Sequence, residues 1–137
     1  MDKHLCYTIR EHVDCTREER LSCVPLIGEI LRLSEFARNK DLSRLESEAG
    51  KVSHALLKQG LLLAVDGTDP RLTEEIMNIS IVYSHKTGVE LLKDIIILDG
   101  VLSIQTGYNA RLIETRLLSY LGEDVFEDAQ KIINEFY

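Results

Sequence analysis

Apolar residues recur at every third or fourth position along most of the chain, which is the spacing of one face of an α-helix. The longest apolar run covers residues 70–106, and only Gly88 interrupts it. Shorter runs lie on both sides of it, and the sequence lacks the alternation of apolar and polar residues that is typical of a β-strand. The pattern predicts an all-α protein, a compact bundle of about six helices with one long central helix around 70–106.

Residues that favour helix ends mark the boundaries of the first expected helices. Thr16 and Glu19 have the spacing of a capping box, in which each side chain accepts a hydrogen bond from the backbone of the other residue. Pro25 lies inside the next apolar run, where it either kinks a helix or divides it near Cys23 or Val24.

The stretch at 60–70, Gly-Leu-Leu-Leu-Ala-Val-Asp-Gly-Thr-Asp-Pro, joins the end of one helix to the start of another. Gly67 can adopt the left-handed conformation that ends many helices, and Asp69 is an N-cap residue followed by Pro70 at the first helical position. Gly60 lies within the preceding helical run at a cost of roughly 1 kcal/mol relative to alanine, which indicates close packing of a neighbouring helix.

Composition and charge narrow the class of protein. With 137 residues, 45% of them hydrophobic and 28% charged, the chain is expected to form one globular domain over 1–137, with residues 1–15 either a weak helix or a loosely packed leader. The net charge of −7 and the dispersed basic residues argue against binding to nucleic acid or anionic lipid and favour a basic or neutral protein partner. No window approaches the roughly 20 apolar residues of a membrane span, and no signal peptide is recognisable, so a cytoplasmic location is expected.

The sequence offers little for catalysis or metal binding. The cysteines, Cys6, Cys15 and Cys23, are odd in number and form no Cys-x-x-Cys pair, which favours a reducing compartment and small apolar roles. His4, Cys6, His12 and Cys15 could be zinc ligands, but their spacing matches no zinc module, so no metal is expected. Phosphate-binding glycine loops, nucleophile elbows and paired His-carboxylate spacings are missing from the sequence, which predicts a non-enzymatic protein without a cofactor.

Two stretches resemble the cytoplasmic part of the MotA family, the stator subunits of the flagellar motor. The first is the leucine-rich run that ends in Val-Asp-Gly-Thr-Asp-Pro at 65–70. The second, Asp-Gly-Val-Leu-Ser-Ile-Gln-Thr-Gly-Tyr-Asn at 99–109, is similar to the family's C-terminal cytoplasmic helix, where an acidic residue and a glycine precede an Ala/Ser-Ile-Gln-x-Gly-x-Asn segment. The resemblance covers roughly residues 25–121 and implies a role in flagellar motility.

The chain departs from the MotA pattern at three places. Ala110 stands where the family usually has proline, and Gly122-Glu123 stands where it often has a pair of prolines. More importantly, the family continues from a segment like 84–88 into two membrane spans, whereas here Val89 follows directly. Without those spans the chain is not expected to conduct ions.

The same resemblance implies a partner-binding site at Arg38 and Glu46. In the family an arginine and, eight residues later, a glutamate that follows a leucine are implicated in contact with the rotor protein FliG, and Arg38 and Leu45-Glu46 have that spacing. Rotor protein of the FliG type or MotA-type stator subunits are therefore the implied partners. Two structural roles compete equally with this one: Ser43 and Glu46 have capping-box spacing, and Arg38 would meet the dipole at the end of a helix.

Two further expectations concern assembly. A generic helical adaptor that keeps the scaffold without a motor role is the alternative function. The broad apolar face over 89–104 exceeds what a contact between two helices needs, which suggests a homo-oligomer.

Overall fold

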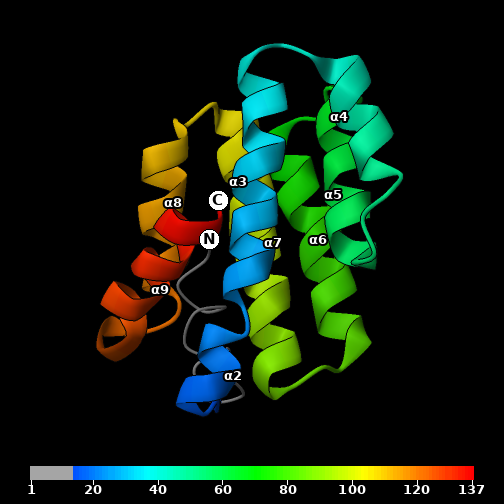
Figure 1. Ribbon diagram of the computed structural model, residues 1–137. Coiled ribbons are helices and arrows are strands. Elements are labelled where there is room, and N and C mark those ends of the chain that lie inside the picture. Colours follow the sequence, from blue (N-terminus) through cyan, green and yellow to red (C-terminus); the bar gives the residue numbers. More distant parts are fainter. Residues whose placement is uncertain (1–13) are drawn as a thin grey trace.

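The computed structural model describes residues 14–137, and all of their regular structure is helical (Figure 1). In chain order the helices are α2 (Arg17–Leu21), α3 (Val24–Arg38), α4 (Leu42–Ala49), α5 (Ala55–Val65), α6 (Pro70–Ser84), α7 (Gly88–Thr106), α8 (Ala110–Ser119) and α9 (Glu123–Phe136). Because these residues contain no strand, the all-α class and the compact bundle are confirmed for them. The helices outnumber the six expected, since two apolar runs each divide into two helices. The expected leader at 1–15 lies almost entirely outside the described residues.

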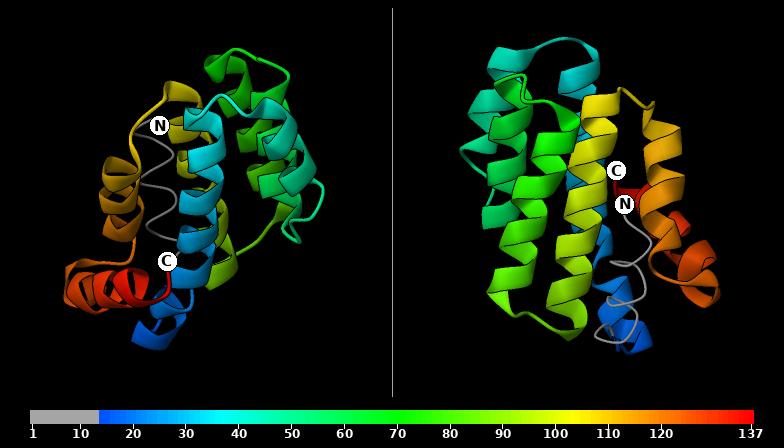
Figure 2. Two further views of the ribbon diagram at one scale, coloured as in Figure 1. Left: turned by 45° about the horizontal axis from the view of Figure 1, so that its top comes forward. Right: turned by 180° about the vertical axis from the view of Figure 1, so that it is seen from behind.

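Helix α7 forms the centre of the bundle. It packs against α3, α5, α6 and α8, and both views in Figure 2 show it between these neighbours. Residues 94–101 are all buried, which covers more than two turns on every side of the helix. The apolar surface of α7 is therefore buried against the neighbouring helices of the bundle. The surplus face that suggested a homo-oligomer does not exist on this helix, and the oligomeric state stays a prediction.

The prediction of one long helix around 70–106 is wrong. Helix α6 ends at Ser84, His85 takes the left-handed conformation with φ 56°, and α7 begins at Gly88 with φ 60°. The chain reverses there, so that α6 and α7 lie antiparallel and side by side (Figure 2, right). Apolar periodicity continued through the break because both helices send their apolar faces into the same core.

Several expected helix ends are confirmed by the backbone. Thr16 and Glu19 form the reciprocal capping box at the start of α2. The run that contains Pro25 is divided rather than kinked, because α2 ends before Cys23 and the proline lies in the first turn of α3. Helices α2 and α3 are thus separated where the sequence allowed a break.

The turn between α5 and α6 has the capping geometry expected from its sequence. The Gly67 N–H donates to the carbonyl of Ala64 at 3.1 Å and the Thr68 N–H to that of Leu63 at 3.0 Å, which is a Schellman motif with left-handed Gly67 at φ 74°. The Asp69 side chain then accepts a hydrogen bond from the Arg71 N–H at 2.8 Å. These bonds fix the path of the chain at this end of the bundle.

The expected close packing at Gly60 is also confirmed. A Cβ placed on Gly60 would lie 2.7 Å from Cγ2 of Val101 in α7 and 2.9 Å from Cε of Met77 in α6. Glycine therefore lets α5 approach both of its neighbours. None of the described helices combines the length and apolarity that crossing a bilayer requires.

Candidate functional site

Arg38 lies at the end of α3, where the chain turns into α4. It is the last residue of the helix, in the position where a cation meets the negative end of the helix dipole. Asn39 and left-handed Lys40, with φ 57°, lead to Asp41 at the start of α4. The side chain of Arg38 is exposed, so the dipole contact leaves its guanidinium open to solvent.

Glu46 is not the capping residue that its spacing with Ser43 allowed. The N-cap of α4 is Asp41, whose side chain accepts a hydrogen bond from the Arg44 N–H at 3.1 Å, and Ser43 lies inside the helix. Of the two explanations for the Leu45-Glu46 pair, the capping box is therefore wrong. Leu45 is buried in the core, and Glu46, one residue further, is exposed.

The carboxylate on α4 that forms ion pairs within the fold is that of Glu48. It is nearly buried and accepts hydrogen bonds from Arg32 at 3.0 Å and Arg44 at 3.3 Å, with the Lys51 ammonium at 3.7 Å. The hydrogen bond from Arg32 is the main cause of a lowered pKa of Glu48. By contrast, Arg38 and Glu46 form no ion pair or hydrogen bond through their side chains with any residue between 14 and 137. The two charges that the family resemblance implied are thus among the exposed charges that the described fold leaves unpaired, and Glu35 on α3 is another.

A small groove opens beside these two residues, between the ends of α3, α5 and α7 and the start of α4. Its volume is about 310 Å³. Most of its lining residues are apolar, although nearly half of the surface that lines it is polar: Ala37, Leu42, Leu45, Ala64, Gly67, Thr68, Pro70, Ile104 and Gln105. The Gln105 amide donates a hydrogen bond to the carbonyl of Thr68 at 3.0 Å. The two stretches that carry the family resemblance, 65–70 and 99–109, therefore meet in space at this groove.

Asp99 belongs to a buried polar cluster between α7 and α8 that the sequence reasoning identified only in part. From the sequence, a carboxylate beside an apolar helix face is expected either to lie at the exposed rim or to bond to a neighbouring helix end, and in the structure Asp99 bonds to side chains at the end of α8. Arg116 donates two hydrogen bonds to it, both at 2.9 Å, while the hydroxyls of Tyr120 and Ser103 donate at 2.5 and 3.1 Å. A charged residue within the apolar run 95–104 was the available signal, but its partner on another helix could not be identified from spacing.

The geometry makes Asp99 a structural residue. Each carboxylate oxygen already accepts two hydrogen bonds, which is its full capacity, so neither is open to a substrate or a metal. Burial by itself would raise the pKa of Asp99, but the hydrogen bonds from Arg116 and Tyr120 outweigh it and hold the pKa below its ordinary value. The ionised carboxylate of Asp99 thus links α7 to α8 through Arg116 and Tyr120.

The other titratable groups of the core suggest no reactive centre. Asp94 is buried in α7 and pairs with Lys86 at 3.2 Å. Cys23 is buried, and burial raises the pKa of its thiol to about 11, whereas half-buried Cys15 has a pKa raised in the same direction by burial. Both cysteines fit the small apolar role expected for them, and the raised pKa of each thiol lowers its thiolate fraction at neutral pH.

Of the four residues considered as zinc ligands, Cys15 lies within the described residues, whereas His4, Cys6 and His12 lie outside them. Within 14–137, His, Cys, Asp and Glu side chains form no group of three or more that could hold a metal ion.

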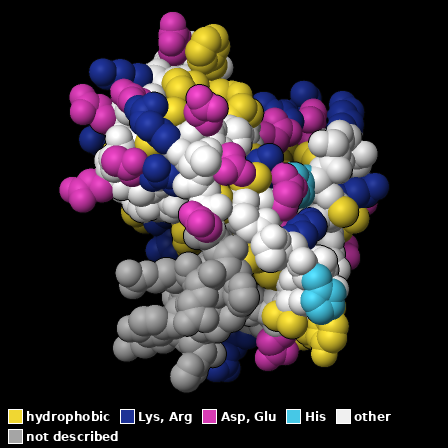
Figure 3. All heavy atoms as spheres, turned by 90° about the horizontal axis from the view of Figure 1, so that it is seen from below, with side chains coloured by type: hydrophobic (Ala, Val, Ile, Leu, Met, Phe, Trp, Pro, Cys, Tyr) yellow, Lys and Arg dark blue, Asp and Glu magenta, His cyan; other side chains and the backbone are white. Residues whose placement is uncertain are grey.

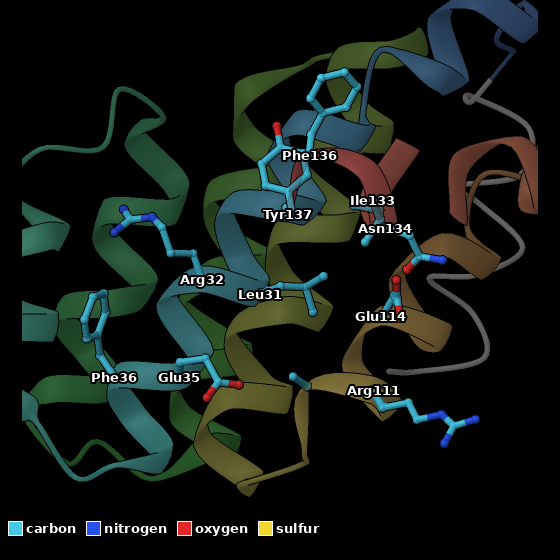
Figure 4. A pocket seen from close by; sticks show the side chains of 12 residues that line it. Leu31, Arg32, Glu35, Phe36, Arg111, Glu114, Ile133, Asn134, Phe136 and Tyr137 are labelled. Atoms are coloured by element: carbon cyan, nitrogen blue, oxygen red, sulfur yellow. The ribbon is translucent and has the colours of Figure 1, made fainter. Parts of the chain in front are cut away.

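A second groove, about 820 Å³, lies between α3, α8 and the end of α9 (Figure 4). Leu31 and Ile133 contribute apolar surface, and the ring of Tyr137 covers Gly28 so closely that a Cβ there would lie 2.5 Å from it. Among its charged side chains, Arg32 is already paired with Glu29 and Glu48. Figure 4 shows Glu35 on α3 and both Arg111 and Glu114 on α8. The groove does not present a nucleophile beside a base.

Exposed apolar side chains gather on α6 rather than on α7. Ile79, Val82 and Tyr83 are 59%, 55% and 75% exposed and follow one another along one side of the helix. In the view from below, hydrophobic side chains lie next to a histidine near the right-hand edge of the molecule (Figure 3). This stripe on α6 is an apolar surface that packing within the described residues does not cover.

Comparison with known proteins gives one informative similarity. The chain is 30% identical over 80 residues to Motility protein A of Borreliella burgdorferi, an alignment that covers 56% of this chain and 31% of the relative. The chain thus spans about a third of the length of that protein. No protein-family model matches the sequence, and no solved structure matches it. The similarity is weak and covers only part of each chain, and it agrees with the resemblance of the two motif stretches to the MotA family. This chain is therefore similar to a segment of Motility protein A, and that similarity suggests a motility-related role.

Proposed function

We propose that this chain is a non-enzymatic, cytoplasmic interaction module of the flagellar motor type, which binds rotor or stator components and does not conduct ions. The observation that carries the proposal is the state of Arg38 and Glu46. Both are exposed and free of ion pairs within residues 14–137, although basic and acidic neighbours on the same two helices are paired with each other.

Unused charges of opposite sign fit a protein interface better than they fit folding. Exposed charges contribute little to stability, whereas charges on an interface rim set partner choice and association rate. Helices α3 and α4 are packed together, so the two residues belong to one end of the bundle. A complementary partner would present an acidic residue to Arg38 and a basic residue to Glu46, and the family resemblance implies a rotor protein of the FliG type.

The test is a binding titration of the full chain against FliG, with the double reversal Arg38→Glu, Glu46→Arg. Saturable binding that the reversal weakens at least tenfold supports the proposal, because each reversed charge faces a like charge. The matched control exchanges another exposed pair, Lys131→Glu with Glu127→Arg on α9, which preserves the net charge and should leave binding unchanged. Equal binding by wild type and reversal, or no binding at micromolar concentrations, contradicts it.

A generic helical adaptor or homo-oligomer is the second candidate, and the apolar stripe on α6 favours it. Ile79, Val82 and Tyr83 expose a surface of the kind that marks association sites. Sedimentation at several protein concentrations, with Ile79→Asp as the comparison, distinguishes the two. Self-association that this substitution abolishes, together with no binding to rotor or stator proteins, favours the adaptor.

A further inference from the structure

We infer that the groove beside Arg38 and Glu46 is an anchor site that takes one apolar side chain from a helix of the partner protein. The inference rests on the proposed function for the identity of the partner and deepens it. The charged pair alone would supply orientation, whereas binding energy at interfaces comes mainly from a few desolvated apolar contacts.

The size and lining of the groove fit an anchor side chain. At about 310 Å³ it is at the low end of the range of about 300–1,000 Å³ that small-molecule pockets occupy, and its walls carry no ionisable side chain. Leu42 lies on its rim with 48% of its surface exposed, although it is the first residue of α4 and a large apolar side chain. Covering Leu42 would bury apolar surface that the free protein leaves in water.

The walls of the groove are held in place before any partner binds. The Schellman motif fixes Gly67 and Thr68, and the Gln105 amide ties the Thr68 carbonyl to the end of α7. On the opposite side, Leu45 is 1% exposed and anchored in the core. Because the recess is already ordered, its own residues lose little conformational entropy when a partner binds, which is the property of an anchor site.

The position of the charges defines the occupant. Arg38 directly follows Ala37 of the groove wall, and Glu46 lies one helical turn after Leu42. A groove whose lining residues Ala37 and Leu45 are each followed in the chain by an exposed charge, one positive and one negative, is complementary to a helix that carries an apolar residue between an acidic and a basic one. The acidic residue would face Arg38 and the basic residue Glu46, and side chains four positions apart lie on one helix face.

The first experiment probes the groove without the partner protein. The isotopically labelled full chain is titrated with a stapled helical peptide that has a central leucine, a glutamate four residues before it and a lysine four residues after it. Amide shifts confined to Ala37, Leu42, Gly67 and Thr68, with at least tenfold weaker binding when the peptide leucine is alanine, support the anchor site. Absence of shifts at these amides, or equal binding by both peptides, overturns it.

The second experiment uses FliG and two variants that match in chemistry and exposure. Leu42→Ser should weaken binding at least tenfold, whereas Leu72→Ser on α6, also 48% exposed in the native protein, should not change it. If FliG binds and both variants bind equally well, the anchor site is refuted while the charged contact stands. If FliG does not bind at all, the proposed rotor role fails, and the peptide titration still decides whether the groove takes an apolar side chain.

Discussion

Replacing Asp99 by asparagine is expected to destabilise the bundle by about 2–3 kcal/mol at neutral pH. The substitution keeps the shape of the side chain and removes its charge. Three donors surround the native carboxylate at 2.5–3.1 Å, and hydrogen bonds to a charged group contribute about 1.5–3 kcal/mol each against about 0.5–1.5 for neutral pairs. The Arg116 side chain is 47% exposed and can regain water, which keeps the loss below the figure for a fully buried ion pair.

The same substitution should change the response to acid. Because the pKa of Asp99 in the folded protein lies below the ordinary value of about 3.9, the folded state binds this proton less readily than the unfolded state does. The stabilisation is complete above about pH 5 and is lost as the pH falls through 3.9 and then through the lower folded pKa. Wild type and Asp99→Asn should therefore differ at pH 7 and converge in stability toward pH 3.

Urea unfolding followed by circular dichroism at a series of pH values measures both effects. The control is Asp128→Asn, which removes the charge of an exposed carboxylate paired with Arg17 and should cost less than about 0.5 kcal/mol at any pH. A loss below 0.5 kcal/mol for Asp99→Asn at pH 7, or a difference from wild type that persists unchanged to pH 3, would refute the role given to the cluster.

Three further substitutions test the packing. Gly60→Ala should destabilise by about 1–3 kcal/mol, despite the helix preference of alanine, because the new Cβ would lie 2.7 Å from Val101; thermal unfolding reports the sign. Gln105→Leu should cost about 1 kcal/mol and increase amide exchange at the α5–α6 turn, since the hydrogen bond to Thr68 is lost; unaltered exchange would contradict this. Ile79→Asn should leave the stability of the monomer within about 0.5 kcal/mol in denaturant titrations, because the side chain is mostly in solvent; a larger loss would place it in an interface.

Signals that act over a few residues were sufficient for much of the fold. The capping box at Thr16, the glycine at position 67 and the close approach at Gly60 were all predicted from residue type and spacing, because each depends on hydrogen bonds or sterics within one turn or one contact. The exposed state of Arg38 and Glu46 agreed with the site that the family resemblance implied. Binding at that site remains a prediction.

Features that depend on which elements meet could not be predicted in the same way. Asp99 and Arg116 lie 17 positions apart on different helices, and several basic residues were equally plausible partners before the packing of α8 was known. The break after Ser84 was missed because a left-handed histidine has no strong sequence signature, while apolar periodicity continues on both sides. Asp41 rather than Ser43 is the N-cap of α4 because α3 ends at Arg38 and α4 begins at Leu42, and residue spacing alone does not determine these boundaries.

The hairpin between α6 and α7 also determines where this bundle can accept additional chain. Residues 85–87 are exposed and connect two antiparallel helices whose ends lie close together at one end of the bundle. A segment inserted there that leaves and returns on the same side would not have to pass through the core or separate any pair of packed helices. The Lys86–Asp94 pair would be the contact most directly affected. A pair of helices could therefore be inserted at this turn, or deleted from it, while the rest of the fold stays intact.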